Sequence, residues 1–260
     1  MRQRVKTSII LAAILIPAVL FGGWADNIII ALVAIFGSME LLKMAKIDLK
    51  SFPSIITYIG ILSIVFYETV SSFIPDHFSE PIIPILSVLF ILISTVIVRG
   101  YNFTMAAISA LTMVYIGFGA RAAIVIRGED LALFIFILLV VMGTDIGAYL
   151  IGSAIGKNKL APLLSPNKTI EGSIGGVATA LAIAVVYLRF FTFTYSYLVM
   201  LLISVILSVT GQFGDFLESA YKRHFNVKDS GTVFPGHGGI LDRFDSVLFT
   251  LAVALLLGIA

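Results

Sequence analysis

LALFIFILLVVMGTDIGAYLI, residues 131–151, is a long apolar run that carries one residue charged at neutral pH, Asp145. A membrane-spanning helix needs about 20 such residues, and an uninterrupted apolar run favours a helix over the alternating strands of a barrel. The whole chain has this character, because 59% of its 260 residues are hydrophobic and 12% are charged. Soluble domains carry about 25% charged residues. The sequence therefore predicts an integral membrane protein.

Nine apolar blocks of this kind follow one another, separated by short segments that hold most of the charged residues. They are Ser8–Gly22, Asn27–Met44, Pro53–Phe73, Ile82–Val98, Phe103–Ile126, Leu131–Ile151, Gly172–Phe190, Tyr197–Tyr221 and Ile240–Ala260. We expect an all-α, polytopic membrane protein with about nine transmembrane helices and no separate soluble domain. The first block also has the basic flank of a cleaved signal peptide, but we favour a retained helix.

Basic residues indicate the orientation of the chain. With the N-terminus in the cytoplasm, all but three of the 17 Lys and Arg residues fall on the cytoplasmic side, as the positive-inside rule requires. Two glycine-containing charged segments, residues 152–172 and 222–239, are then cytoplasmic. The short chain without a long soluble N-terminus suggests a bacterial inner membrane. A net charge of +2 gives no reason to expect a nucleic-acid partner, and the absence of cysteine excludes disulfides and thiolate metal sites.

Acidic side chains within predicted spans need a partner or a function, because an Asp near the bilayer centre costs about 2.5 to 3.5 kcal/mol. Asp145 and Asp215 lie at similar depth near the predicted cytoplasmic ends of their helices. Asp215 and Glu218 share one helical face, and Asp242 and Asp245 share another. Carboxylates without cysteine suit a hard cation such as Mg²⁺, which also takes water and substrate phosphate oxygens. Beside cationic, glycine-containing loops, they indicate phosphoryl or nucleotidyl transfer.

Residues 219–245 read SAYKRHFNVKDSGTVFPGHGGILDRFD, which closely resembles the signature of the phosphatidate cytidylyltransferases, also called CDP-diacylglycerol synthases. TDIGAY at 144–149, SPNKTIEG at 165–172 and GQFGD at 211–215 accompany it in the order expected. The resemblance covers residues 140–246. We therefore expect a hydrophobic transmembrane scaffold at residues 1–130 and a transmembrane catalytic region at residues 131–260, within one integrated membrane domain.

The resemblance implies an enzyme that converts CTP and phosphatidate to CDP-diacylglycerol and pyrophosphate, dependent on Mg²⁺, in phospholipid biosynthesis. CTP and phosphatidate would be its substrates, and membrane lipids would surround it. The sequence also allows a homodimer. The nucleophile would be the phosphate monoester of phosphatidate, whose second pKa lies near about 6 by analogy with phosphorylated side chains. No general base is then required. The protein would align two anions by means of cations and metal.

Site residues follow from this interpretation. The predicted catalytic residues are Asp215, Asp242, Lys168 and His237. The predicted ligands of Mg²⁺, with or without a second cation, are Asp215, Asp242, Asp245 and Asp145. The predicted substrate-binding residues are Ser165, Lys168, Lys222, Arg223, Lys228, Gly238, Gly239 and Arg243. We expect a turn at residues 165–167 and the following helix N-terminus to hold Lys168 against the triphosphate.

Structural alternatives stand beside these roles. The acids could form buried ion pairs, for instance with Arg223 or Arg243, and the cations could be ordinary membrane-surface residues. His237 could make a structural hydrogen bond, and Glu171 could cap a helix instead of orienting a ligand. Two rival functions are a CTP-dependent lipid kinase, which moves the γ-phosphate to a hydroxyl, and a cation-coupled transporter. A CDP-alcohol phosphotransferase is disfavoured because its paired-aspartate motif on one helix is absent.

Overall fold

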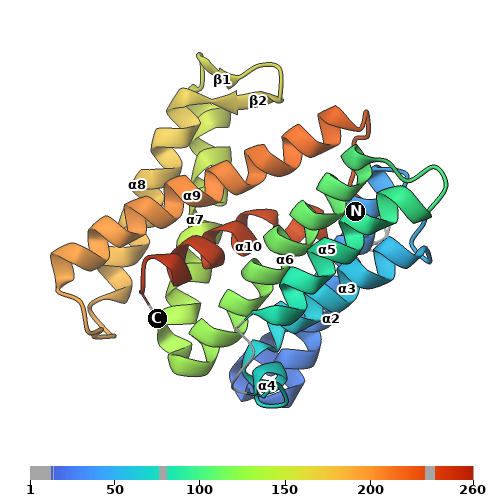
Figure 1. Ribbon diagram of the computed structural model, residues 1–260. Helices are drawn as coiled ribbons and strands as arrows, with labels where there is room; N and C mark the ends of the chain where they lie inside the picture. The colour runs from blue at the N-terminus through green and yellow to red at the C-terminus, as the bar shows by residue number, and fades with distance from the viewer. Residues whose placement is uncertain (1–12, 14, 76–80, 232–237, 260) are drawn as a thin grey trace. The chain divides into compact units, whose positions relative to one another are not determined.

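The structure, a computed structural model, describes residues 13, 15–75, 81–231 and 238–259, and most of them are helical (Figure 1). The helices are α2 (Trp24–Met44), α3 (Phe52–Val65), α4 (Tyr67–Ser71), α5 (Ile82–Ile97), α6 (Phe103–Glu129), α7 (Leu131–Ile155), α8 (Ile170–Tyr187), α9 (Tyr197–His224) and α10 (Leu241–Leu256). Two strands, β1 (Lys159–Ala161) and β2 (Ser165–Thr169), form a hairpin. Residues 8–12 and 14 of the predicted span Ser8–Gly22 lie outside the described residues, and residues 15–21 are helical.

Five of the described helices, α2, α6, α7, α8 and α9, are long and apolar enough to cross a membrane. α3 and α5 are apolar but shorter. The predicted span Pro53–Phe73 is wrong as a single helix, because the backbone leaves helical geometry at Phe66 and divides the segment into α3 and α4. The chain is therefore a helical membrane protein. The number of nine spans and the cytoplasmic N-terminus stay predictions.

The chain divides into two compact units. Unit 1 comprises Met1–Ile124 and Val227–Asp242, and unit 2 comprises Val125–Asn226 and Arg243–Ala260. The sequence predicts a different, functional division, with a scaffold at residues 1–130 and a catalytic region at residues 131–260. This division stays a prediction.

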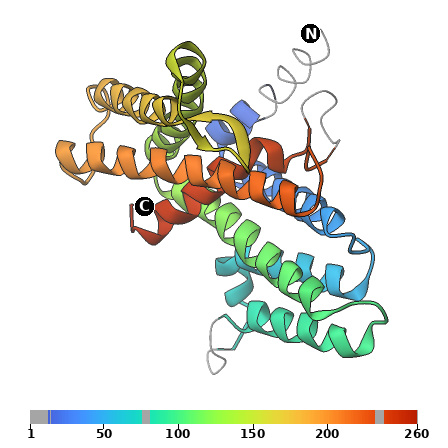
Figure 2. The ribbon, with the colours of Figure 1, turned by 90° about the horizontal axis from the view of Figure 1, so that it is seen from above.

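In unit 2, α7, α8 and α9 pack against one another (Figure 2). Small residues allow α7 and α8 to approach closely. A Cβ on Gly172 would lie 2.7 Å from the Ala148 carbonyl oxygen, and one on Gly176 would lie 2.8 Å from the Thr144 carbonyl oxygen. Small residues four positions apart let helix backbones meet in this way within a bilayer, where apolar burial does not drive association. The glycines thus bring residues 144–148 of α7 close to residues 172–176 of α8.

The β1–β2 hairpin joins α7 to α8, with Lys159 opposite Thr169 and Ala161 opposite Ser165. The predicted turn at residues 165–167 is therefore wrong, because these residues pair with β1 as part of β2. Thr169 caps α8 by accepting a hydrogen bond from the Gly172 amide at 3.1 Å. Glu171 accepts hydrogen bonds from the amides of residues 157 and 158 and from the side chain of Asn158 at 2.7 Å. Glu171 therefore holds the loop that follows α7, and a role in capping a helix or orienting a ligand stays a prediction.

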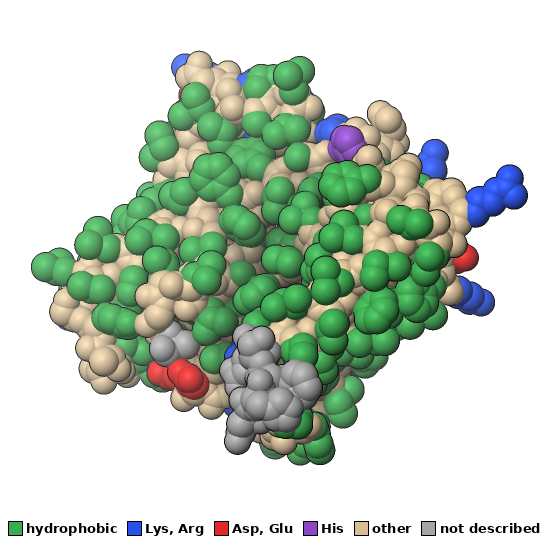
Figure 3. Space-filling model, in the orientation of Figure 1, with side chains coloured by type: hydrophobic (Ala, Val, Ile, Leu, Met, Phe, Trp, Pro, Cys, Tyr) green, Lys and Arg blue, Asp and Glu red, His purple; other side chains and the backbone are tan. Residues whose placement is uncertain are grey.

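The surface is rich in apolar side chains. Val96 is 86% exposed, Leu198 71% and Ile146 56%, and hydrophobic side chains are spread over the whole face in Figure 3, where charged side chains are few. Soluble monomers rarely expose contiguous apolar surface of this kind. This exposed apolar surface is therefore expected to contact the lipid of a membrane.

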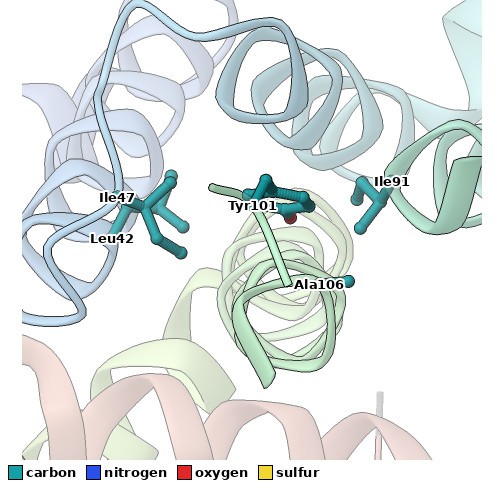
Figure 4. Packing of buried hydrophobic residues seen from close by; sticks show 5 residues of the cluster. All are labelled: Leu42, Ile47, Ile91, Tyr101 and Ala106. Atoms are coloured by element: carbon teal, nitrogen blue, oxygen red, sulfur yellow. The ribbon is translucent and has the colours of Figure 1, made fainter. Parts of the chain in front are cut away.

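In unit 1, α2 packs against α3, and α3 packs against α5. A buried cluster formed by Leu42, Ile47, Ile91, Tyr101 and Ala106 joins α2, α5 and α6. Figure 4 shows the Tyr101 ring between Leu42 and Ile47 on one side and Ile91 on the other. Its hydroxyl donates to Ser109 Oγ at 2.8 Å, so the polar end of this buried ring is satisfied. The cluster fixes the end of α2 that carries Glu40, two residues before Leu42.

Candidate active site

Three acidic side chains of unit 2 come together from three helices. Asp145 lies on α7, Asp215 on α9 and Asp245 on α10. Asp145 interacts electrostatically with Asp215 and Asp245, and Asp215 interacts with Asp245. Asp245 is buried, at 8% exposure, whereas Asp145 reaches the surface. Because neighbouring like charges destabilise the ionised carboxylates, a cation beside this acidic cluster would stabilise it.

Lys168, on β2, supplies positive charge to the acidic cluster. Its Nζ lies 2.5 Å from Asp215 Oδ2, and the two side chains are 28% and 34% exposed. The same Nζ lies 4.2 Å from the centre of the Phe216 ring. Lys168 also interacts electrostatically with Asp145 and Asp245. Asp215 therefore forms an ion pair, as the structural alternative proposed, but with a lysine in place of an arginine, and both side chains are partly exposed.

Two further cations lie at the end of α9. Lys222 Nζ is 2.6 Å from Glu218 Oε2, and the Glu218 side chain is only 4% exposed. Lys222 also interacts electrostatically with Asp245. Arg223 Nε donates to the Leu164 carbonyl oxygen at 3.3 Å, so it ties the β1–β2 hairpin to α9. Lys222 thus belongs with the acidic cluster, and Arg223 has a structural contact.

A hydrogen-bonded pair that the sequence did not single out joins α8 to α9 beside the acidic cluster. Ser173 Oγ donates to Gln212 Oε1 at 2.5 Å, and Gln212 Nε2 donates back to the Ser173 carbonyl oxygen at 3.4 Å. Gln212 lies three residues before Asp215, so the pair holds the turn of α9 that presents Asp215. In the sequence, the only sign that Gln212 belongs to the site is its position in the family-like segment GQFGD, residues 211–215.

Asp242 belongs to unit 1. Its Oδ2 accepts hydrogen bonds from the Ser230 amide at 3.0 Å and the Gly239 amide at 2.8 Å, and it lies 2.9 Å from the Ser230 hydroxyl oxygen. Gly238 has a φ of +83°, and a Cβ on it would collide with the Asp242 carboxylate. The glycines of the signature therefore make room for a carboxylate of the chain itself.

The remaining predicted site residues differ in their exposure to solvent or lipid. Ser165 lies half-buried in β2, and Lys228 and Arg243 are exposed. His237 lies outside the described residues. That Asp242 and Asp215 share one cation stays a prediction. Glu40, to which the sequence gave no role, contacts the same segment as Asp242 through the Ser230 hydroxyl.

The side chains of the acidic cluster fit a partly protein-bound magnesium ion. Within the described part of the chain, no group of three or more His, Asp or Glu side chains is arranged so that together they could hold a metal ion, so a cation here would have at most two side chains of the acidic cluster as ligands. Mg²⁺ usually takes only one or two carboxylates and fills its shell with water and substrate phosphates. Asp215 and Asp145 are accessible oxygen donors of that kind.

Comparisons with known proteins cover nearly the whole chain. The sequence profile of the cytidylyltransferase family matches residues 2–259. The phosphatidate cytidylyltransferase of Staphylococcus saprophyticus is 40% identical over 253 residues, which cover 96% of each chain. That of Bacillus subtilis is 39% identical over 255 residues, covering 96% of this chain and 95% of its own. That of Staphylococcus aureus is 37% identical over 259 residues. These matches include both units and all the site residues above, and the chain belongs to the cytidylyltransferase family.

Proposed function

We propose that this chain is a phosphatidate cytidylyltransferase, which transfers the cytidylyl group of CTP to phosphatidate. A phosphate oxygen of phosphatidate forms a bond to the α-phosphorus of CTP, and the bond from that phosphorus to the bridging oxygen breaks, releasing pyrophosphate. The observation that carries the proposal is the acidic cluster of Asp145, Asp215 and Asp245 around Lys168. It stands in a chain whose relatives bear this name over nearly their whole length.

The acidic cluster would hold Mg²⁺ through Asp215 and Asp145, which are accessible, with the buried Asp245 orienting them. Bound there, the ion would neutralise charge on the triphosphate and on the departing pyrophosphate. Asp242 is the further proposed ligand. Because the attacking phosphate is already ionised near neutral pH, the chain's own residues act by position and charge.

Lys168 would bind the triphosphate. Without nucleotide it neutralises Asp215, which lets three acids stay close together. Its side chain is flexible and 28% exposed, so Nζ can turn from Asp215 to a phosphate oxygen when a nucleotide arrives. Lys168 would then pair with a phosphate oxygen, and the Asp215 carboxylate would become free to hold the cation. Nucleotide binding and cation binding would be coupled in this way.

The cationic residues beyond Lys168 would neutralise phosphatidate and pyrophosphate. They are Lys222, Arg223, Lys228 and Arg243, and His237, Ser165 and the Gly238–Gly239 backbone would contribute hydrogen bonds. The lysines of residues 152–172 and 222–239 support a site that opens to the cytoplasm of a bacterial cell, through the positive-inside rule. Phosphatidate would then reach it from the inner leaflet.

Labelled CTP tests the proposal directly. Purified protein in detergent micelles with phosphatidate and Mg²⁺ should transfer label from [α-³²P]CTP into lipid, and label from [γ-³²P]CTP should appear only in pyrophosphate. A lipid kinase would give the reverse, with γ-label in the lipid. Absence of any labelled product would contradict an enzymatic role. Asp48→Asn, which removes an exposed carboxylate in unit 1 far in sequence from the acidic cluster, serves as the matched control for Asp215→Asn.

A further inference from the structure

Glu40 is a buried acid near the C-terminal end of α2, with 5% of its surface exposed. Its carboxylate lies among three hydrogen-bonding groups of the signature segment. Ile240 N donates to Oε1 at 2.9 Å, Leu241 N donates to Oε2 at 2.9 Å, and the Ser230 hydroxyl oxygen lies 2.9 Å from Oε2. A buried carboxylate with these partners is a specific arrangement, because an uncompensated charge there would be strongly unfavourable.

These contacts place Glu40 at the N-terminus of α10, which begins at Leu241. The first amides of a helix have no partner within the helix, and the helix dipole favours a negative charge beside them. Such a cap usually comes from a neighbouring residue in sequence, whereas here it comes from α2. A Cβ on Gly231 or Gly239 would collide with the Glu40 carboxylate, so the signature segment lies directly against it.

Ser230 connects Glu40 to Asp242. Its hydroxyl lies 2.9 Å from Glu40 Oε2 and 2.9 Å from Asp242 Oδ2, and the residue is 4% exposed. The Ser230 and Gly239 amides also donate to Asp242 Oδ2. The two amides, together with the Ser230 hydroxyl that bridges the two carboxylates, fix the plane of the Asp242 carboxylate, and therefore the direction in which its Oδ1 points.

We propose that Glu40 is a positioning residue for cytidylyl transfer. It fixes the described ends of the signature segment, around residues 230 and 239–241, together with the start of α10, and it thereby sets the orientation of the Asp242 carboxylate. The inference rests on the proposed function, since it assigns Asp242 to the cation. Hydrogen-bonding partners of metal ligands typically change activity by about 10- to 100-fold when they are removed.

Enzyme kinetics provide the first test. Glu40→Gln should lower kcat by about 10- to 100-fold and raise the Mg²⁺ concentration for half-maximal rate, while KM for CTP changes by less than about twofold. Glu40→Asp keeps the charge and should recover part of the loss. Ser38→Ala is the matched control, because Ser38 is equally buried on α2 but donates only to the Ile35 carbonyl oxygen of its own helix. It should behave as the wild type.

Thiol labelling provides a second readout that does not depend on activity. The chain has no cysteine, so an Asp229→Cys variant carries a single exposed thiol beside Ser230. Glu40→Gln should increase the rate at which this thiol reacts with a maleimide. The Glu40→Gln, Ser230→Ala double variant should have nearly the kcat of Glu40→Gln alone, because each substitution breaks the same link from Glu40 through Ser230 to Asp242.

Wild-type kcat and Mg²⁺ dependence in Glu40→Gln would overturn the proposal, whether or not labelling changes. If Glu40→Gln does not fold, Glu40→Asp and Ser230→Ala decide by the same measurements. Failure of the proposed function is distinguishable, because the wild type itself would then form no labelled CDP-lipid.

Discussion

Asp215→Asn separates stability from catalysis in the acidic cluster. The substitution keeps the shape of the side chain and removes one of three negative charges. It breaks the 2.5 Å pair with Lys168, but both side chains are about one-third exposed, so the pair is worth about 1 kcal/mol or less. Relief of repulsion from Asp145 and Asp245 is of similar size and opposite sign. The free energy of unfolding should therefore change by less than about 1 kcal/mol.

Catalysis should respond very differently. Loss of one preorganised electrostatic contact to a transition state typically costs about 10²- to 10³-fold in kcat, and Asp215 would also be lost as a ligand of Mg²⁺. Transfer of label from [α-³²P]CTP to lipid measures the rate. Thermal unfolding with and without Mg²⁺ and CTP measures binding, since a ligand at about 100 times its Kd stabilises a protein by about 2.7 kcal/mol.

Lys168→Met is the informative comparison. It leaves the three acids together without their lysine, so it should lower the unfolding temperature more than Asp215→Asn does. Asp215→Asn should unfold near the wild-type temperature but show no stabilisation by Mg²⁺ and CTP. The reasoning would be refuted by an Asp215→Asn protein with near-wild-type transfer, or by one that Mg²⁺ and CTP stabilise as they do the wild type.

Three further substitutions test the packing. Gly239→Ala should lower the free energy of unfolding by about 1 to 3 kcal/mol, because its methyl group would collide with the Glu40 carboxylate and the Ser230 hydroxyl. Gly128→Ala is the control, because a methyl group there meets open space. It should leave the unfolding temperature unchanged in the same thermal unfolding assay. Gly172→Ala should separate α7 from α8 and cost about 1 to 3 kcal/mol; unchanged unfolding would argue against the close approach. Arg121→Ala breaks a 2.7 Å pair with the 64% exposed Glu68, so it should cost about 1 kcal/mol or less and leave transfer activity unchanged.

Helices and intramembrane acids could be predicted from the sequence because both depend on local rules. Span length and hydropathy located the segments that form α2 and α5–α9, and the cost of burying a charge singled out Asp145 and Asp215. Their similar predicted depth agrees with their interaction in unit 2. The ends of helices are harder to place, since α7 continues to Ile155 beyond the predicted end.

Features that depend on distant pairing could not be predicted in the same way. Pro166 and Asn167 suggested a turn, but pairing with β1 outweighed that preference. Glu40 was missed because its donors lie about 200 positions away in the chain. The rule that singled out Asp145 applies equally to Glu40, since both are acids within predicted spans. The glycines of α7 and α8 recur at four-residue spacing, a signal for close helix packing that the sequence does contain.

Manganese offers the most direct measurement of the central claim, that the acidic cluster holds a divalent cation that bridges to the nucleotide. Mn²⁺ prefers the same oxygen ligands as Mg²⁺ and can be observed by electron paramagnetic resonance. With CTP bound, pulsed spectra of the wild-type protein should show coupling between Mn²⁺ and the ³¹P nuclei of the triphosphate, and Asp215→Asn should lose the protein-bound signal. Equal Mn²⁺ binding and equal ³¹P coupling in the wild type and Asp215→Asn would contradict the claim.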